Sequence, residues 1–438
     1  MRILLISPWE KRHRRYHSPL RSLIAYAPLT LPMVKALIPA ELNATVQVFD
    51  EFKDKKLPYG PFDVVGISAM TSEAARAYQL ADHYRSQGAF VVLGGYHVTF
   101  MPQEALCHAD ALVTGMGQRA WPQLLRDLAA GNPTHTLYDD DAFDDDEPGL
   151  IVIDTVPDRG IIPFPPYAPV DTVIATQGCP NHCSFCSISQ MAAFRQRSID
   201  RVIAELRGLK RRMVIFYDPN FFADRAYALD LMKQMEPLRL HWGATATVDF
   251  GFDDELLRAA KRAGCYGVLI GFESFDPQAL RGANKRFCDP SRYRQAVENI
   301  HRQGMTINGT FVLGLDADTE EGLSALPNAV RELGIDLPIY FIATPTPGSA
   351  LYERMQREGR ILTRDWSRYT QADVVFRPQQ LTPERLFALY QRAWCESYKL
   401  RNIIRRVFTA PGLSLTHKVA VLCMNIGFKF CGTDREHV

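Results

Sequence analysis

Residues 175–189, ATQGCPNHCSFCSIS, place Cys179, Cys183 and Cys186 within eight positions, whereas the other six cysteines are scattered singly. A structural zinc site normally has four ligands. The nearest fourth candidate, His182, lies inside the same tight loop, where tetrahedral coordination by all four residues would strain the backbone. A 4Fe-4S cubane usually takes four cysteines, one for each iron. Three cysteines therefore favour a cluster with one open iron over a zinc site.

The segments around this motif predict a parallel β/α barrel. From residue 172 to residue 348, six apolar stretches alternate with five amphipathic ones. Strands that are apolar on both faces and joined by short turns are typical of a parallel sheet covered by helices. Six such units form a partial barrel with an open side. The cysteine motif follows the first strand, on the face where barrel enzymes carry their chemistry.

The first 131 residues predict a separate, doubly wound α/β domain. Short apolar strands alternate there with amphipathic helical segments, as in a parallel sheet with helices on both faces. Ligands of such sheets bind beyond the carboxyl ends of the strands. Here these ends read SAMTS at 68–72, GGYH at 94–97 and GMGQ at 115–118. Small residues at three strand ends favour a ligand site. For each glycine, the alternative is that it only allows the chain to turn.

Two further segments complete the expected domain organisation. The acidic block at 138–149 and the proline-rich stretch at 162–169 indicate a solvated linker. After about residue 350 the pattern becomes helical and amphipathic. We therefore expect a Rossmann-like domain at 1–135, a linker at 136–169, a partial barrel at 170–355 and a helical C-terminal region at 356–438.

The composition favours a cytoplasmic protein. Its 50 Lys and Arg against 49 Asp and Glu leave no overall field that would attract nucleic acid. An odd number of cysteines and an N-terminus unlike a signal peptide favour a reducing compartment. No stretch reaches about 18 uninterrupted apolar residues, so a membrane span is not expected. The amphipathic C-terminal helices leave two alternatives, which are ordinary helix packing and peripheral contact with a membrane surface.

The motif Cys-x3-Cys-x2-Cys, with Phe185 before its last cysteine and a six-unit barrel around it, resembles the radical S-adenosylmethionine (SAM) superfamily. The resemblance implies that the three cysteines bind a 4Fe-4S cluster whose open iron holds the methionine part of SAM. An electron from the cluster would then cleave SAM to a 5'-deoxyadenosyl radical. The resemblance also implies a protein electron donor such as flavodoxin or ferredoxin.

The same resemblance implies that later strand ends contribute to SAM binding. Asp218 in YDPNFF would bind the SAM amino group, where many relatives have Gly-Gly-Glu, and Glu273 would lie near the ribose or carboxylate. For both residues, capping of the following helix is the plain alternative. The implied SAM-binding residues are Phe185, Asp218, Thr245, Thr247, Glu273, Ser274, Val312 and Leu315.

A doubly wound domain with GGYHVT and GMGQ ahead of such a barrel is similar to the radical SAM class that carries a B12-binding domain, and the similarity covers residues 1 to about 370. The chain lacks the Asp-x-His-x-x-Gly motif, which implies a corrinoid bound without a lower histidine ligand. It also has GMGQ where relatives usually have Gly-Glu-Gly-Glu. The implied cobalamin-binding residues are Ser68, Thr71, Ser72, Gly94, Gly95, His97, Gly115 and Gly117.

This class implies a cobalamin-dependent methyltransferase that acts on an unactivated carbon of a lipid, tetrapyrrole or natural-product precursor. One alternative is a radical SAM cyclase, oxidoreductase or carbon–carbon bond-forming enzyme whose front domain is structural. A second is a non-catalytic corrinoid or iron-sulfur binding protein. Methyl transfer would yield S-adenosylhomocysteine beside 5'-deoxyadenosine, the first alternative would yield 5'-deoxyadenosine alone, and the second would cleave no SAM.

Overall fold

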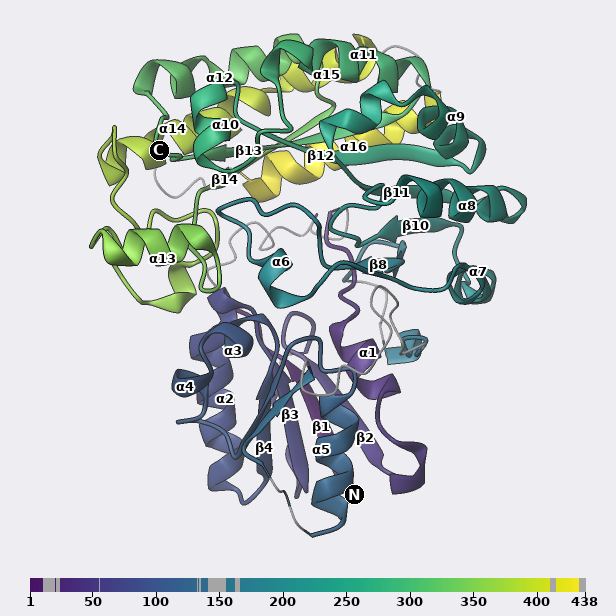
Figure 1. Ribbon diagram of the computed structural model, residues 1–438, viewed down its shortest axis with the longest axis vertical. Coiled ribbons are helices and arrows are strands. Elements are labelled where there is room, and N and C mark those ends of the chain that lie inside the picture. Colours follow the sequence, from purple (N-terminus) through teal and green to yellow (C-terminus); the bar gives the residue numbers. More distant parts are fainter. Residues whose placement is uncertain are drawn as a thin grey trace.

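The computed structural model describes residues 1–10, 20, 24–54, 56–131, 133, 135–140, 155–161, 166–409 and 415–432. These residues form two six-stranded parallel sheets and one short antiparallel pair. Figure 1 shows the N-terminal sheet, in purple and blue, at one end of the molecule and the second sheet, in teal and green, at the other. Residues 141–149 of the acidic block and 162–165 of the proline-rich stretch, both predicted as linker, lie outside the described residues.

The N-terminal domain is doubly wound, as predicted, with its strands in the order β2-β1-β3-β4-β5-β6. One face of the sheet packs against Leu80 and Tyr84, and the other packs against Trp121 and Leu124. Because both faces are covered, the central strands are apolar throughout. The elements are β1 (Arg2–Ser7), α1 (Thr30–Ala36), β2 (Thr45–Asp50), β3 (Val64–Ser68), α2 (Ala74–Ser86), β4 (Phe90–Gly94), α3 (Tyr96–Phe100), α4 (Pro102–Ala105), β5 (Ala111–Thr114) and α5 (Ala120–Ala129).

The sixth strand of this sheet, β6 (Leu137–Asp139), lies inside the segment that the sequence predicts to be linker. Only Tyr138 of this strand is buried, and its hydroxyl donates to the Asp127 carboxylate at 2.8 Å. Three residues with a single buried side chain give no periodicity to recognise in a sequence. The N-terminal sheet therefore extends to residue 139.

The second sheet is a partial barrel, which confirms the predicted fold class. Its six parallel strands run in the order β7-β10-β11-β12-β13-β14, and the two end strands do not pair with each other. Aspartates begin several of its helices. For example, the Asp253 carboxylate accepts from two backbone N–H groups of α9. The strands and helices are β7 (Asp171–Val173), α7 (Ile199–Gly208), β10 (Met213–Phe216), α8 (Arg225–Met235), β11 (His241–Ala246), α9 (Asp254–Arg262), β12 (Cys265–Glu273), α10 (Pro277–Gly282), α11 (Tyr293–Arg302), β13 (Thr306–Leu313), α12 (Glu320–Leu333) and β14 (Leu337–Ile342).

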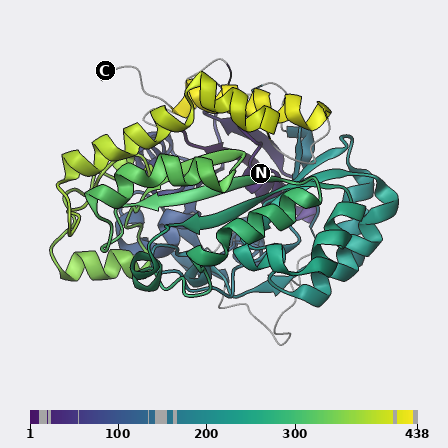
Figure 2. The same cartoon turned by 90° about the horizontal axis from the view of Figure 1, so that it is seen from above.

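The C-terminal region adds four helices, α13 (Ala350–Arg357), α14 (Pro383–Ser397), α15 (Leu400–Thr409) and α16 (Leu415–Gly432). The last two lie in the half of the molecule remote from the N-terminal domain, and both are held to the start of β14 (Figures 1 and 2). There, the side chains of Arg406 and Asn425 donate to the carbonyl oxygen of Asp336 at 3.4 and 3.2 Å. Across the described ranges, no helix combines the length and apolarity that crossing a membrane requires.

Between α13 and α14, the chain returns to the N-terminal domain as a strap, residues 361–376, whose ends meet in a bridge between Ile361 and Phe376. Trp366 of the strap is buried, and its indole N–H donates to the Glu104 carboxylate at 2.7 Å. Val375 is fully buried in the core of the N-terminal domain. The sequence pattern predicts only a helical region for this segment, so the strap is an addition to that expectation.

Candidate functional site

The three cysteines lie on one loop between the first barrel strand and α7, after β8 (Thr176–Gln177) and before α6 (Ile188–Met191). Backbone hydrogen bonds hold the loop on two sides. The Ser184 N–H donates to the carbonyl of Ala283 at 2.9 Å, and the Leu351 N–H donates to the carbonyl of Ser184 at 2.7 Å. In addition, the Asn284 side-chain amide donates to the carbonyl of His182 at 2.7 Å. The conformation of the cysteine loop is therefore fixed by contacts with later segments of the chain as well as by its own sequence.

The donor set of this loop fits an iron-sulfur cluster. Cys179, Cys183 and Cys186 are half-buried thiols without a disulfide. Burial raises the pKa of Cys183 to about 12 and also raises the pKa of Cys186. Among the described residues, no three Cys, His, Asp or Glu side chains converge on a point that would suit a single ion. Cysteines that bind a cubane each take a separate iron, so they have no need to converge in this way.

Asp218 follows β10 and supports the cysteine loop from the interior of the barrel. Its carboxylate accepts from the backbone N–H groups of Ala175 and Thr176 and, at 2.7 Å, from the Thr176 hydroxyl. The side chain is fully buried, and burial raises its pKa to about 6. Asp218 does not cap a helix, and its described bonds all go to the strand ahead of the cysteines. Its contact with SAM stays a prediction.

Glu273, at the end of β12, forms a buried ion pair with Lys285, at 2.6 Å between Oε1 and Nζ. Burial opposes the charge of Lys285, but Glu273 outweighs that effect and the pKa of Lys285 is raised. The second oxygen of Glu273 accepts from the Thr310 hydroxyl at 3.3 Å. Glu273 also has a positive φ of 63°, a strained conformation for this residue type that clusters at functional sites. Helix α10 is capped by Asp276 instead.

The remaining residues predicted to bind SAM also lie near the carboxyl ends of barrel strands. Thr245 and Thr247 are half-buried, with one residue between them, and Phe185 packs against the barrel core. Ser274 is buried, and its hydroxyl accepts from the Asp276 N–H at 3.0 Å. The structure thus places these four residues at the same end of the barrel as the cysteines.

Val312 lies in β13, and Leu315 lies in the turn after it, which is held by Asp318. One oxygen of this carboxylate accepts from the backbone N–H groups of Gly314 and Leu315, at 2.8 and 2.9 Å. Val312 and Leu315 are themselves buried. Burial raises the pKa of Asp318 to about 7.

We expect Asp318 to make the protein less stable as pH rises from about 4 to about 7. In this range the folded chain keeps the proton that the unfolded chain has released, so the free energy of unfolding falls by on the order of 4 kcal/mol. Asp318→Asn keeps an oxygen acceptor but removes the titration, and should flatten the dependence. Urea denaturation at pH 5 and pH 8 measures the effect, with the exposed Asp249→Asn as control. An unchanged slope in Asp318→Asn would contradict the prediction.

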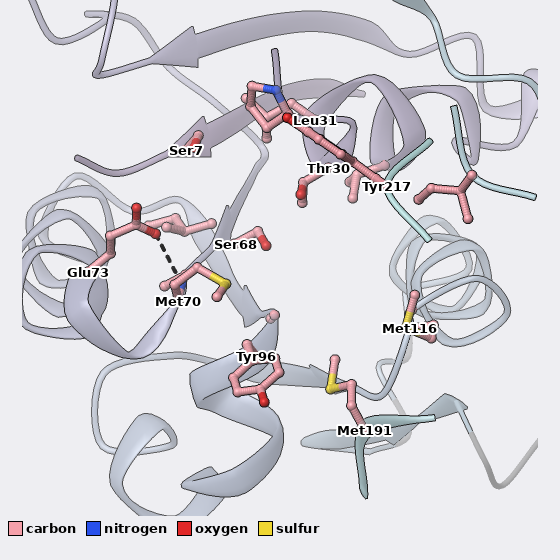
Figure 3. A pocket seen from close by; sticks show the side chains of 18 of the residues that line it. Ser7, Thr30, Leu31, Ser68, Met70, Glu73, Tyr96, Met116, Met191 and Tyr217 are labelled. Atoms are coloured by element: carbon pink, nitrogen blue, oxygen red, sulfur yellow. Dashed lines mark hydrogen bonds between the residues drawn. The ribbon is translucent and has the colours of Figure 1, made fainter. Parts of the chain in front are cut away.

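A cavity of about 650 Å³ lies between the N-terminal domain and the barrel. Figure 3 shows Ser7, Ser68 and Tyr96 of the N-terminal domain around this cavity, together with Met191 and Tyr217 of the barrel. Gly178 and Ile188, which flank the three cysteines in sequence, also line it. One cavity therefore touches both the strand ends of the N-terminal sheet and the two ends of the cysteine loop.

Five of the eight residues predicted to bind cobalamin line this cavity: Ser68, Gly94, Gly95, Gly115 and Gly117. Gly95 has a φ of 96°, and a Cβ there would lie 2.7 Å from the Ser68 Oγ. Only glycine is therefore tolerated where the chain turns into α3.

The cavity also continues along one face of the N-terminal sheet, which fits a long cofactor. Leu5, Gly66 and Val92 line it from three adjacent strands, while Val34 and Trp121 line it from the helices that cover this face. A Cβ on Gly66 would lie 3.2 Å from both Leu5 Cδ2 and Trp121 Cη2. Gly66 thus lies in the cavity wall where even a Cβ would be tight against its neighbours.

Thr71, Ser72 and His97 lie elsewhere and do not line the cavity. His97 is fully buried, with its ring 5.0 Å from that of Trp366 and its Nε2 3.6 Å from the Glu104 carboxylate. The alternation of α3 explains this position, because a helix turns successive residues to different sides. The structure thus assigns His97 to the contact with the strap rather than to the cavity.

Sequence reasoning missed several polar residues of the cavity. Asp50 ends β2 and is hydrogen-bonded to the Tyr167 hydroxyl, while the Glu73 carboxylate accepts from the Met70 N–H at 3.0 Å. Burial raises the pKa of Asp50, and it raises the pKa of Glu73 to about 7. The amide side chains of a corrin ring need such acceptors. The sequence signal for these acceptors was weak, because it consisted of a single acidic residue, Asp50, at the end of β2.

Tyr96 links the two domains at this site. It directly follows Gly95, lines the cavity, and its hydroxyl is hydrogen-bonded to the hydroxyl of Ser187, the residue after Cys186. Burial raises the pKa of Tyr96 to about 12, so the phenol stays protonated at neutral pH. This hydrogen bond therefore couples the position of the N-terminal domain to the position of the cysteine loop.

Comparisons with family models divide the chain in the same way as the structure. Residues 42–125 match the B12 binding domain, and residues 173–326 match the radical SAM superfamily. Residues 349–415, which include the strap, match a domain of unknown function, DUF4070.

Comparisons with individual proteins cover most of the chain. A bacteriochlorophyllide d C-12(1)-methyltransferase of Chlorobaculum tepidum is 30% identical over 88% of this chain and 85% of the relative. The C-8(2)-methyltransferase of the same organism is 28% identical over 92% and 91%. The structure of the radical SAM methyltransferase TsrM from Kitasatospora setae, with cobalamin and cluster bound, has a TM-score of 0.64 at 16% identity, covering 82% of this chain and 78% of that one. At this low identity, the similarity to TsrM shows a shared fold.

Proposed function

The chain belongs to the radical SAM superfamily, in the class with a B12-binding domain ahead of the barrel, and on that premise we propose that it transfers methyl groups to an unactivated carbon atom. The observation that carries the proposal is the shared cavity. It joins the strand ends of the B12-binding domain to the residues on either side of the three cysteines. Methyl transfer to a substrate radical requires the two cofactors to face one space. If the front domain were only structural, no shared cavity would be needed.

When bound, the cluster with SAM supplies a carbon-centred radical and the corrinoid supplies the methyl group. The chain itself fixes where this happens. The bonds of Asp218 to the strand before Cys179, and that of Ser184 to Ala283, hold the cysteine loop against the barrel. The link from Tyr96 to Ser187 sets the position of the front domain. Fixed geometry of this kind is what orients a short-lived radical toward a single bond.

The proposed substrate is a chlorophyll-type tetrapyrrole. Support comes from the two bacteriochlorophyllide methyltransferases, each of which matches this chain over more than four fifths of both lengths. A lipid precursor is the competing substrate class. Assays of the reconstituted protein with a bacteriochlorophyllide and with a polycyclic lipid separate the two, because only the true substrate gains a methyl group in mass spectrometry.

An acidic one-electron carrier of the flavodoxin or ferredoxin type is the proposed donor. The cysteine loop reaches the surface at His182, and exposed Arg281 and Arg286 flank the residues to which the loop is bonded. A basic rim next to the cluster favours the approach of an acidic protein. Arg281→Glu together with Arg286→Glu should slow reduction by such a carrier and leave reduction by dithionite unchanged.

The proposal is tested by anaerobic reconstitution with iron, sulfide and cobalamin, followed by incubation with SAM and a reductant. Methyl transfer should give S-adenosylhomocysteine and 5'-deoxyadenosine in equal amounts, with cluster and corrinoid bands both present in the absorption spectrum. A radical cyclase or oxidase would give 5'-deoxyadenosine alone. A protein that takes up the cluster but no corrinoid would contradict the proposal.

We expect Tyr96→Phe to uncouple the two halves of the reaction. The change keeps the ring in the cavity but removes the hydrogen bond to Ser187, a contact worth about 1 kcal/mol. The yield of S-adenosylhomocysteine per 5'-deoxyadenosine should therefore fall several-fold, while SAM cleavage persists. Tyr59→Phe, at an exposed tyrosine of the same domain, is the control. An unaltered product ratio would show that the bond does not position the domains.

A further inference from the structure

The last two helices belong to a segment that carries basic residues and no acidic ones. From residue 397 to residue 433 there are six Lys and Arg and no Asp or Glu, whereas the remaining residues hold 44 Lys and Arg against 49 Asp and Glu. A nearly neutral protein thus carries a local excess of positive charge on this segment, as it also does at residues 11–40, and Lys399 of the segment pairs with Glu396 just before it. Clusters of four to eight basic residues on amphipathic helices are typical of surfaces that meet anionic lipid.

Helix α15 is apolar on the side that faces away from the protein. Ile403 and Val407 point into the core and are 0% and 2% exposed. Leu400, Ile404 and Phe408, spaced by four residues, lie on another face and are 57%, 46% and 65% exposed. Residues at this spacing form one stripe on a helix. The stripe has no counterpart in the described part of the protein to pack against.

Helix α16 continues this surface. It lies beside α15 and packs inward through Val421 and Asn425, which are nearly or fully buried. Leu415, Val419 and Phe430 are 76%, 53% and 46% exposed. Six of the sixteen large hydrophobic residues that are exposed in the described part of the chain therefore belong to these two helices. An exposed apolar patch of this kind marks an interaction site.

From the charge and the exposure together, we infer that α15 and α16 form a peripheral binding surface for a membrane that contains anionic lipid. The exposed side chains of Arg401 and Arg405 lie next to Leu400 and Ile404 in sequence, so apolar insertion and attraction to phosphate groups occur on one face. Such a surface lies in the headgroup region and does not span the bilayer.

The orientation is compatible with the proposed catalysis, on which the inference does not depend. The helices are bonded to Asp336, at the amino end of β14, whereas the cavity and the cysteine loop lie at the carboxyl ends of the strands. Figures 1 and 2 show the pair on the barrel, remote from the B12-binding domain. A membrane on this face would leave the mouth of the barrel uncovered.

A second copy of the chain is a poorer occupant of this surface. A twofold contact would bring the exposed Arg401 and Arg405 of two copies against one another, and like charges at an interface oppose association. Anionic lipid neutralises the same charges. The balance of charge, rather than the apolar stripe alone, therefore selects the membrane.

Sedimentation of the full-length protein with vesicles tests the inference. We expect binding to vesicles of equal parts phosphatidylcholine and phosphatidylglycerol, little binding to phosphatidylcholine alone, and release at high salt. Arg401→Gln and Arg405→Gln should each weaken binding about fivefold, and Phe408→Ser at least about tenfold. Tyr59→Ser, at a residue 96% exposed on the B12-binding domain, should have no effect.

Three results would overturn the inference. They are equal binding to neutral and anionic vesicles, full binding by Phe408→Ser, and a dimer in sedimentation velocity without lipid that Phe408→Ser converts to monomer. The last result would assign the surface to a second copy. SAM cleavage by Phe408→Ser in solution should equal that of the wild type, so loss of binding with intact cleavage separates this surface from the catalytic site.

Discussion

Replacing Cys183 with alanine is expected to abolish SAM cleavage, with a loss of about a thousandfold or more. Cys183 is the central cysteine of the loop, and the backbone bonds of Ser184 hold the loop in place without its thiol. The change should therefore remove one cluster ligand without unfolding the loop. Iron analysis and the absorption spectrum after reconstitution report the cluster, and chromatography of 5'-deoxyadenosine reports cleavage.

Corrinoid binding provides the internal check on this variant. The cavity is lined by residues on both sides of the cysteines but not by Cys183 itself, so Cys183→Ala should bind cobalamin as the wild type does. Cys107→Ala, at an exposed cysteine of the B12-binding domain, is the matched control and should retain cleavage. Substantial SAM cleavage by Cys183→Ala would argue against a radical SAM enzyme altogether.

Replacing Gly66 with valine is expected to block corrinoid binding selectively. A single Cβ at this position would already lie 3.2 Å from Leu5 Cδ2 and Trp121 Cη2, and the two further methyl groups of valine would crowd this wall of the cavity. Overpacking of this kind costs about 1–3 kcal/mol, which corresponds to roughly five- to 150-fold weaker binding. Formation of S-adenosylhomocysteine should fall in parallel, while the cluster still forms and 5'-deoxyadenosine is still produced.

Two further variants guard against a trivial loss of folding. Gly208→Val adds the same side chain at the end of α7, where nothing lies within 4 Å of the new Cβ, and should bind cobalamin normally. Met116→Trp fills the cavity from a partly exposed position and should reproduce the loss without disturbing the sheet. Normal corrinoid content in both Gly66→Val and Met116→Trp would place the corrinoid outside this cavity.

The fold and the cysteine site were predictable because their signals are local. The spacing of Cys179, Cys183 and Cys186 lies within one loop, and strands that are apolar on both faces stand out from the amphipathic helices between them. The tips of parallel strands meet at one edge of a sheet, which is why Ser68 and Gly95, far from Gly115 in sequence, were correctly expected to lie together.

The features that sequence reasoning missed depend on contacts between distant segments. The bond from Tyr96 to Ser187 joins residues 91 positions apart, and that from Trp366 to Glu104 joins residues 262 apart. No periodicity or motif records such a pairing. The bonds of Asp218 to Ala175 and Thr176, 43 and 42 positions earlier, are a further example, and its contact with SAM stays a prediction.

The strap has a consequence for the stability of the loaded protein. The cavity has walls from both domains, and Trp366 fastens the front domain from the far end of the sequence. A ligand that touches both walls binds only the docked arrangement of the two domains, so it stabilises that arrangement by mass action. We therefore expect cobalamin added during reconstitution to raise the temperature at which the whole chain unfolds.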